Sequence, residues 1–463
     1  MVLRAALLAT ALVGCGEVAS LPPDSTAESC VPDEFIDCAG DAARRCNATG
    51  DGTIDEACGV ASCNAAAGRC NACVPAAPMC SVGAIAQCGA DGLPLAAVAT
   101  EACAVGCVDP KPGIPAHCAY IEPTYPALAN ACDVPASSDL AIASDTNVDT
   151  TTDDFACTGG IVPQPNGMAI CVVRHRTITI ASGKRLVVKG NRLLALISDD
   201  ALTISGTLDA SANATVDGPG GGFYRSGGAA TSGNGGGGAG FKTAGGAGGS
   251  EGSNGGAANG GMGVSNPITL TMTGGSRGVT ATTSPVAKSG GAGGGVILIS
   301  CRGQVSVPGT VDVSGGGGEA GRDVTLGVGK SFIAGGGGGS GGYLVIQGVA
   351  VVVTGSVYSN GGAGGGGCGV DDGTGAAGAD GSPTATAASG GVPTGTAGGG
   401  GDGGYVTSGP QVGDKPTGFP ASAGGGGGSA GFLQTYTPSS VTPVLAPSTA
   451  SPNFQSNRVV PTR

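Results

Sequence analysis

The stretch Leu194 to Ser211 (LALISDDALTISGTLDAS) aligns, with at most one residue of slippage, with Val296 to Ser314 (VILISCRGQVSVPGTVDVS) and Tyr343 to Asn360 (YLVIQGVAVVVTGSVYSN). Each stretch holds three short β-prone runs separated by Gly or small polar residues, with an apolar residue at every second position. A unit this short cannot bury its apolar face alone, so it must stack on copies of itself. The repeats therefore predict an all-β fold, a right-handed parallel β-solenoid, over residues 167–437.

The alignment also predicts which side chains are equivalent. Leu196, Leu298 and Val345 should point inward at matching places, as should Ile204, Val307 and Val353. Asp209 matches Asp312 and then Tyr358, at a position that is expected to face outward.

The composition excludes several classes of protein. Of 463 residues 95 are Gly, most of them after Asp217, but no strict Gly-X-Y period indicates collagen. Aromatic residues make up 3% and charged residues 12%, so neither a conventional core nor an ordinary charged surface is expected. The net charge of −12 with no basic stripe excludes nucleic acid as a partner, because phosphate binding needs clustered Lys and Arg.

Residues 1–15 (MVLRAALLATALVGC) carry Arg4, an apolar run from Ala5 to Val13, and the tetrad Leu12-Val13-Gly14-Cys15. The segment resembles a bacterial lipoprotein signal peptide with a lipobox, which implies removal of what precedes Cys15 and a lipid on its thiol. The alternative is a plain secretory signal with a chance Cys. Either way the run is too short for a spanning helix, which needs ~20 apolar residues. Residues 16–29 are expected to be a linker.

Residues 30–118 contain twelve of the eighteen cysteines, in two sets of six that form tandem modules at 30–70 and 73–118. The sets are Cys30, Cys38, Cys46, Cys58, Cys63 and Cys70, then Cys73, Cys80, Cys88, Cys103, Cys107 and Cys118. Modules this small bury too little core to be stable without cross-links, so disulfides formed in an oxidising compartment are expected. The sequence does not determine how the cysteines pair.

The pair Cys70 and Cys73 also has the spacing of a redox or zinc pair. The duplication favours another interpretation, in which Cys70 ends one module and Cys73 begins the next. The modules resemble Cys-rich repeats of myxobacterial surface lipoproteins, which implies an extracellular spacer or contact role.

Outside the modules, Cys132, Cys157 and Cys171 are expected to supply one more disulfide. Cys301 and Cys368 are expected to be free thiols, because an odd number of cysteines remains once Cys15 is lipidated.

Residues 119–166 are expected to be a linker and the Pro/Ser/Thr-rich residues 438–463 a tail. Within 167–437 three Gly-rich excursions leave the stack at one corner, at about 212–267, 315–342 and 361–431. They are either flexible linker or, as we favour, partly ordered polyglycine-II-like layers, because Gly lets extended backbones pack closely. Expected strand runs also include 268–272 and one that starts near Gly431. The region resembles Gly-rich β-helix regions of myxobacterial surface proteins, and resembles mycobacterial glycine-rich repeat surface proteins in composition.

Few motifs indicate ligand chemistry. Val324 to Ser331 ends in Gly-Lys-Ser but lacks the first Gly of a phosphate-binding loop, so no nucleotide is expected. Asp380 and Asp402 fail the tandem calcium-binding nonapeptide pattern. Asp153-Asp154 and Asp371-Asp372 are expected to be solvated turns rather than a calcium site. No metal or other cofactor is expected.

Some parallel β-helices cleave polysaccharides, using paired carboxylates or calcium with a cationic base. The residues that would serve here are Asp199, Asp200, Asp209, Arg174, His175 and Arg176. Asp199 and Asp200 read more simply as a turn, and His175 between two arginines as a solvated strand edge.

The sequence therefore predicts an exported, lipid-anchored protein of the bacterial cell envelope, at the outer membrane or cell surface. Its expected role is structural or adhesive, without catalysis, and its expected partners are the membrane and extracellular polysaccharide or surface proteins. The alternative is a β-helix that binds polysaccharide or cleaves it as a lyase or hydrolase.

Overall fold

The structure is a computed structural model that describes residues 29–463 except 112–113, 153–156, 166, 223–232, 253–257, 264–270, 280–286, 327–328, 370–372 and 407. Cys15, Asp153-Asp154, Asp371-Asp372 and most of the expected strand at 268–272 lie outside the described residues. The described residues are almost entirely β, with two short 3-10 helices and no α-helix. No described helix is long and apolar enough to cross a membrane.

The chain divides into two compact units. The smaller is made of residues up to Met79 with Ala86–Thr100 and Asp109–Pro115, and the larger of Cys80–Ile85, Glu101–Val108 and Ala116–Arg463. The second six-cysteine module therefore contributes residues to both units.

The first cysteine module is built from short antiparallel strands: β1 (Phe35–Ala39), β2 (Ala42–Cys46), β3 (Thr53–Ala57), β4 (Cys63–Asn64) and β5 (Arg69–Cys70), with the helix η1 (Gly59–Ala61). The second repeats this plan with β6 (Pro78–Ser81), β7 (Ala84–Cys88), β8 (Pro94–Ala102), β9 (Cys107–Val108) and β10 (His117–Cys118). The three disulfides of each module join its first cysteine to the third, second to the fifth and fourth to the sixth: Cys30–Cys46, Cys38–Cys63, Cys58–Cys70, then Cys73–Cys88, Cys80–Cys107, Cys103–Cys118. Identical connectivity is what a tandem duplication produces.

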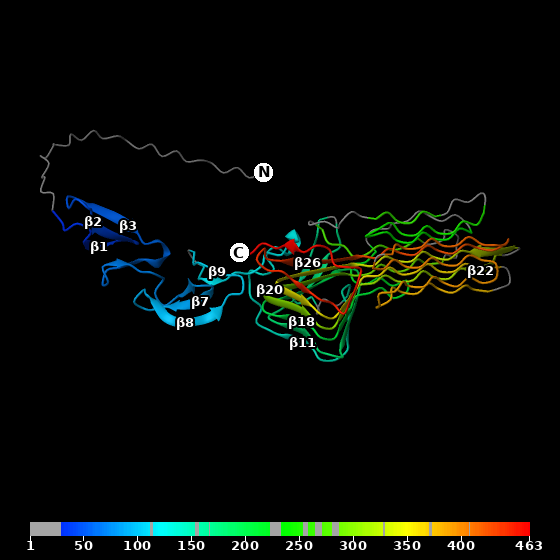
Figure 1. Cartoon of the computed structure of the whole chain (residues 1–463), viewed down its shortest axis with the longest axis horizontal. Helices are drawn as coiled ribbons and strands as arrows, with labels where there is room; N and C mark the ends of the chain where they lie inside the picture. The colour runs from blue at the N-terminus through cyan, green and yellow to red at the C-terminus, as the bar shows by residue number, and fades with distance from the viewer. Residues whose placement is uncertain are drawn as a thin grey trace, which may run out of the picture. The chain divides into compact units, whose positions relative to one another are not determined.

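In the larger unit the strands form three rows in which neighbours run parallel and in register (Figure 1). The first row is β14 (Ile170–His175), β17 (Leu193–Ser198), the beginnings of β20 (Gly295–Val307) and β24 (Tyr343–Val353), and β26 (Phe432–Thr437). The second row is β11 (Leu140–Ile142), β15 (Ile178–Ile180), β18 (Leu202–Ile204), the ends of β20 and β24, and β27 (Val444–Leu445). The third row is β12 (Thr146–Asp149), β16 (Arg185–Lys189), β19 (Thr207–Asp209), β21 (Thr310–Asp312), β25 (Ser356–Tyr358) and β28 (Thr449–Ser451).

The three rows share one apolar core. Its members come from alternate positions of all three rows and include Leu196, Leu298, Ile204, Val307 and Val353, each 1% exposed or less. The predicted inward position is confirmed for these five residues. The predicted pairings of Leu196 with Leu298 and of Val307 with Val353 are confirmed as well.

The predicted place of Val345 is wrong by one residue. Ile346 pairs with Leu298, and Val345 packs in a second cluster on the other side of the first row. That side is buried as well, beneath the segment that holds the helix η2 (Pro126–Leu128). A strand buried on both faces shows no apolar–polar alternation, so the sequence could not fix its register.

Two segments that were expected outside the stack belong to it. Residues 119–166 supply β11 and β12, and also β13 (Ile161–Val162), which pairs antiparallel with β14. Residues 438–463, expected to be a tail, supply β27, β28 and β29 (Arg458–Val459), and β29 pairs with β26. These strands were not predicted because the segments are rich in Pro and Ser, which is typical of linkers. An outermost strand pairs on one side only and therefore tolerates Pro.

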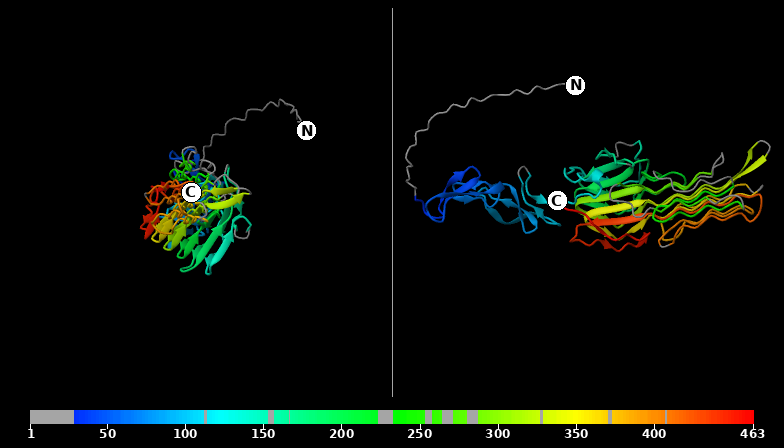
Figure 2. Two further views of the ribbon diagram at one scale, coloured as in Figure 1. Left: turned by 90° about the vertical axis from the view of Figure 1, so that its right-hand side faces the viewer. Right: turned by 90° about the horizontal axis from the view of Figure 1, so that it is seen from above.

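The Gly-rich excursions leave after β19, β21 and β25 of the third row and return at β20, β24 and β26 of the first. They run outward from the strand rows as long neighbouring segments, and a hairpin of β22 (Arg322–Leu326) and β23 (Gly329–Ile333) lies at their far end (Figures 1 and 2). This hairpin contains Val324 to Ser331, so the Gly-Lys-Ser sequence lies on antiparallel strands rather than between a strand and a helix.

Residues 335–341 show how the segments are held together. Every third amide donates to the same neighbour: Gly335, Gly338 and Gly341 donate to the carbonyls of Ala423, Gly426 and Ser429. The amides of Gly336 and Gly339 donate to the carbonyls of Glu319 and Gly316 on a second neighbour. The amides of Gly337 and Ser340 donate to the carbonyls of Val279 and Ser276 on a third. The carbonyls of this segment accept in turn from residues 236–239, 290–293 and 362–365. We call the segments linked in this way the glycine array.

At many of its glycine positions the array leaves no room for a side chain. A Cβ at Gly338 would lie 2.1 Å from the carbonyl oxygen of Gly362, and one at Gly339 would lie 1.9 Å from that of Gly291. Neighbouring backbones are therefore in direct contact, and glycine is required at these positions by the lack of space.

Candidate functional site

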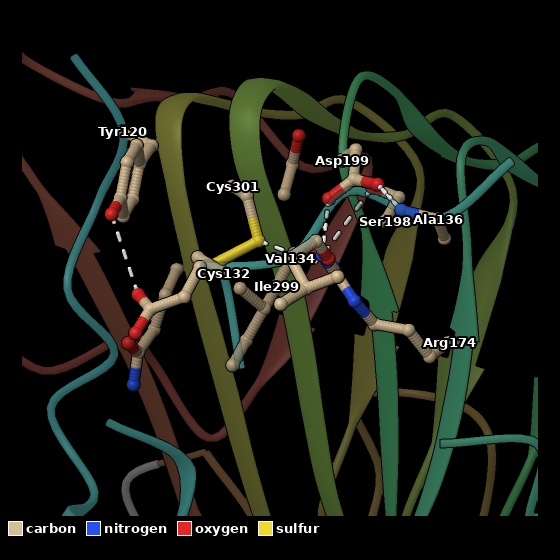
Figure 3. Close-up of a disulfide and its surroundings, with 12 residues drawn as sticks. Tyr120, Cys132, Val134, Ala136, Arg174, Ser198, Asp199, Ile299 and Cys301 are labelled. Atoms are coloured by element: carbon tan, nitrogen blue, oxygen red, sulfur yellow. Dashed lines mark hydrogen bonds and ion pairs between the residues drawn. A yellow bond between two sulfur atoms is a disulfide. The ribbon is translucent and has the colours of Figure 1, made fainter. Parts of the chain in front are cut away.

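Among the residues considered for catalysis, Arg174 and Asp199 form a buried ion pair (Figure 3). Their side chains are 12% and 4% exposed. Asp199 also accepts the backbone amide of Ala136, while Arg174 donates to the carbonyl of Val134 and the sulfur of Cys301. The pair thus attaches the segment around residues 134–136 to the first row, which is a structural role.

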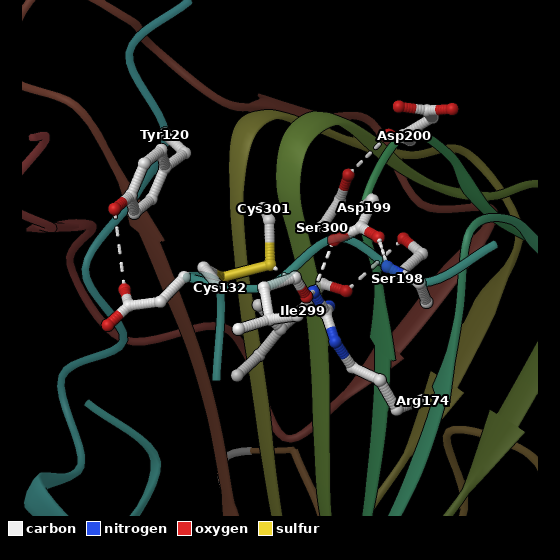
Figure 4. Close-up of polar contacts among 12 residues, drawn as sticks. Tyr120, Cys132, Arg174, Ser198, Asp199, Asp200, Ile299, Ser300 and Cys301 are labelled. Atoms are coloured by element: carbon white, nitrogen blue, oxygen red, sulfur yellow. Dashed lines mark hydrogen bonds and ion pairs between the residues drawn. A yellow bond between two sulfur atoms is a disulfide. The ribbon is translucent and has the colours of Figure 1, made fainter. Parts of the chain in front are cut away.

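The neighbouring candidates point elsewhere. The Asp200 side chain is exposed and directed away from Asp199, while its carbonyl accepts a bond from the Ser300 hydroxyl (Figure 4). His175 lies between the hydroxyls of Ser138 and Thr158. Asp199 and Asp200 therefore do not form the pair of facing carboxylates that glycoside cleavage uses.

Arg176 forms an exposed ion pair with Asp139. Hydrogen bonds from Arg176 and then from Thr177 lower the pKa of Asp139 to about 2. This pair lies on the surface and its two charges cancel, so Arg176 is not an available cationic base.

Asp209 lies in the third row and pairs with Asp312 and then Tyr358, as predicted. All three side chains face away from the core, as expected, but they are buried rather than exposed to solvent. Burial raises the pKa of Asp312 to about 6. Burial acts on Asp209 too, but hydrogen bonds from Ser211 and the charges of Lys189 and Arg185 outweigh it and lower the pKa of Asp209.

Arg174 and Asp199 are therefore brought together, whereas the side chains of the other four candidates have other partners or face solvent, and Asp209 lies in a different row. Within the described ranges, no group of three or more His, Cys, Asp or Glu side chains is arranged to hold a metal ion. Asp209 and Asp312 lie on neighbouring strands, where the first two excursions leave the third row.

The cysteines outside the modules form two disulfides rather than one. Cys157 pairs with Cys171, and Cys132 pairs with Cys301. The expectation of a free thiol at Cys301 is wrong, because the chain before the first row folds back over it, which sequence spacing does not reveal. Cys368 is free and buried within the array.

Sequence reasoning missed a concave site in the larger unit. It is a hollow of about 360 Å³ at the corner where the first excursion leaves, lined by Thr151, Met168, Gly190, Asn191, Val216, Asp217, Gly221, Gly222 and Arg277. Its polar wall includes Asp217, whose carboxylate accepts hydrogen bonds from the guanidinium of Arg277 and from the backbone amide of Ala292. No short motif marks it, because its residues come from five separate parts of the chain.

Comparison with known proteins adds no assignment: no family model, no curated protein and no solved structure matches this chain.

Proposed function

We propose that the three strand rows are the faces of a right-handed parallel β-solenoid, and that the glycine array is a set of polyglycine-II-like insertions projecting from one corner of it. The recurring order of the strands and the common exit and return points of the excursions support the solenoid. The three-residue hydrogen-bond period supports the polyglycine-II geometry, since an extended polyproline-type helix has ~3 residues per turn.

We propose further that the protein is an exported, lipid-anchored element of a bacterial cell surface with a structural or adhesive role. The observation that carries this proposal is the array. Backbones linked on several sides form a stiff body, and its outer segments present small uncharged side chains such as the exposed Ala376, Ala377 and Thr386. Such a surface suits extended contact with a matrix polymer or with another surface protein.

The disulfides support the address. Eight of them occur among the described residues, in both units, and disulfides of this density persist in oxidising compartments. Together with the lipobox-like tetrad that ends at Cys15, they favour export followed by attachment of a lipid to the Cys15 thiol.

Mass spectrometry of the membrane fraction tests the anchor. We expect a mature chain that begins with an acylated Cys15, and loss of the acyl group in Cys15→Ser. A soluble mature chain that begins elsewhere would contradict the anchor.

A second experiment tests the non-catalytic role, using a panel of polysaccharides incubated with the purified protein. We expect no release of unsaturated or reducing sugar ends. Release by the wild type that disappears in Asp209→Asn, a variant checked to be folded, would favour the enzymatic alternative instead.

A further inference from the structure

The hollow around Asp217 and Arg277 has both polar and apolar walls. The Asp217 side chain is 16% exposed and that of Arg277 46% exposed. Val216, 56% exposed, and the thioether of Met168 add apolar surface to the lining of the same hollow. A ring that carries hydroxyl groups along its edge and C–H groups on its face matches both walls.

Several hydrogen-bonding groups of the hollow are available. Arg277 uses Nε and Nη2 to hold Asp217, and among the described residues its Nη1 has no bonded partner. The side-chain amide of Asn191 is exposed and likewise has no partner in the described structure. The Thr151 hydroxyl accepts the amide of Asn191 and keeps its own proton to donate. The hollow therefore presents both hydrogen-bond donors and hydrogen-bond acceptors to a ligand.

Glycine keeps this wall open. Gly222 has φ +79°, and a Cβ there would lie 2.8 Å from Oδ2 of Asp217 and 3.1 Å from Nε of Arg277. Gly190, with φ +117°, also lines the hollow, and a Cβ there would lie 2.5 Å from the Thr150 hydroxyl oxygen. Any other residue at either position would be strained and would fill the hollow or its rim.

We propose that this hollow binds a neutral pyranose unit of an extracellular polysaccharide. The volume is near the lower end of the range for ligand sites, roughly 300–1,000 Å³, which suits one sugar ring rather than a larger ligand. The carboxylate of Asp217 is already neutralised by Arg277, so the site offers no net charge to attract a charged sugar. The inference rests on the proposed surface function, for which it names a ligand class.

The test is saturation-transfer NMR and calorimetry on the purified full chain, with D-glucose, D-galactose, D-mannose, N-acetylglucosamine and, as a charged probe, D-glucuronate. We expect saturable binding of at least one neutral sugar with Kd on the order of 1 mM. Asn191→Ala should weaken that binding by about three- to tenfold, as expected for one lost hydrogen bond. Val216→Ser should weaken it too, because it removes the apolar wall.

The matched control is Gln411→Ala, which removes an exposed amide from another part of the larger unit and should leave binding unchanged. The exposed Asn191 side chain makes no hydrogen bond within the described structure, so its variant should stay folded, which thermal unfolding checks. Absence of binding by every neutral sugar, binding of glucuronate alone, or equal binding by wild type and Asn191→Ala would each overturn the proposal. Acylation of Cys15 is measured separately, so failure here is distinguishable from failure of the surface function.

Discussion

In the strand rows, alternate side chains of Val, Ile and Leu meet in a shared core, whereas in the glycine array neighbouring backbones touch directly at glycine positions. Burying a Leu or Ile side chain contributes roughly 1.5–3 kcal/mol. A backbone hydrogen bond contributes only about 0.5–1.5 kcal/mol net, which is comparable to the ~1–2 kcal/mol that ordering one residue costs. The array is therefore marginal by itself and depends on the strand rows, which hold both ends of every excursion.

The largest expected effect comes from the side-chain core. Leu298→Asp places an unpaired charge among residues that are 0–1% exposed, and we expect a loss of more than ~4 kcal/mol in the free energy of unfolding. The rows and the array should both lose structure, because the array has no other support. Thermal unfolding followed by circular dichroism measures this, with Leu298→Met as the volume-matched control. A variant that kept its array would show that the array is independent of the rows.

The second effect concerns the buried ion pair. Asp199→Asn leaves the buried Arg174 without its carboxylate, so we expect a loss of about 3–5 kcal/mol. Asp200→Asn, one residue away but exposed, should change stability by less than ~0.5 kcal/mol. Denaturant unfolding of the two single variants compares them directly. Equal effects would mean that the Arg174–Asp199 pair contributes nothing to the first row.

The third effect belongs to the array alone. Gly339→Ala forces a Cβ against the carbonyl of Gly291, and we expect a loss of about 1–3 kcal/mol that is confined to the array. Gly409→Ala is the matched control, since a Cβ there meets no atom within 4 Å. Hydrogen exchange should speed up in residues 287–294 and 335–342 while amides of β17 and β20 stay protected. Unchanged exchange in Gly339→Ala would contradict the close packing.

The last effect is a pH dependence of the stability, and it arises where the rows meet the array. Burial raises the pKa of Asp312 to about 6, so its contribution to stability is full below its unfolded pKa, near 4, and is lost as the pH rises through about 6. The charged groups that act on it are Asp209 and Lys189. The pKa of Asp209 is lowered, so its contribution to stability is lost as the pH falls, at pH values below this range. Thermal midpoints should therefore fall between pH 4 and pH 7 in the wild type and change less in Asp312→Asn; parallel curves would argue against a buried carboxyl there.

The comparison also explains how far the sequence could predict the structure. The second and third rows were predictable, because runs such as Ile178–Ile180 alternate buried and half-buried residues between small polar turns. In the first row the pairing of Leu196 with Leu298 was predicted, but the register of β24 was one residue off, since Val345 and Ile346 are both buried. The array was suggested by Gly content alone. Which segments are neighbours in it follows from the three-residue hydrogen-bond period and from the rows that hold their ends.

The site was harder to predict than the fold. Asp199 and Asp200 look equivalent in the sequence, but one is buried against Arg174 and the other faces solvent. The hollow around Asp217 depends on turns at Gly190 and Gly222 that bring separate segments to one corner. No local pattern encodes such convergence. The Cys132–Cys301 disulfide was missed for the same reason.

If the chain is exported as proposed, the Cys132–Cys301 disulfide sets an order in which the bonds can form. The bonds of the two modules and Cys157–Cys171 join residues 12 to 27 positions apart, so each can close as soon as its own short stretch has crossed the membrane. Cys132 must wait for a partner 169 residues further along. During that interval the strands β11 to β19 and the whole first excursion have to emerge, while Cys132 remains reactive near Cys157 and Cys171 in the sequence. Correct oxidation therefore requires the two local cysteines to pair first, and a disulfide isomerase would be needed wherever translocation outpaces that pairing.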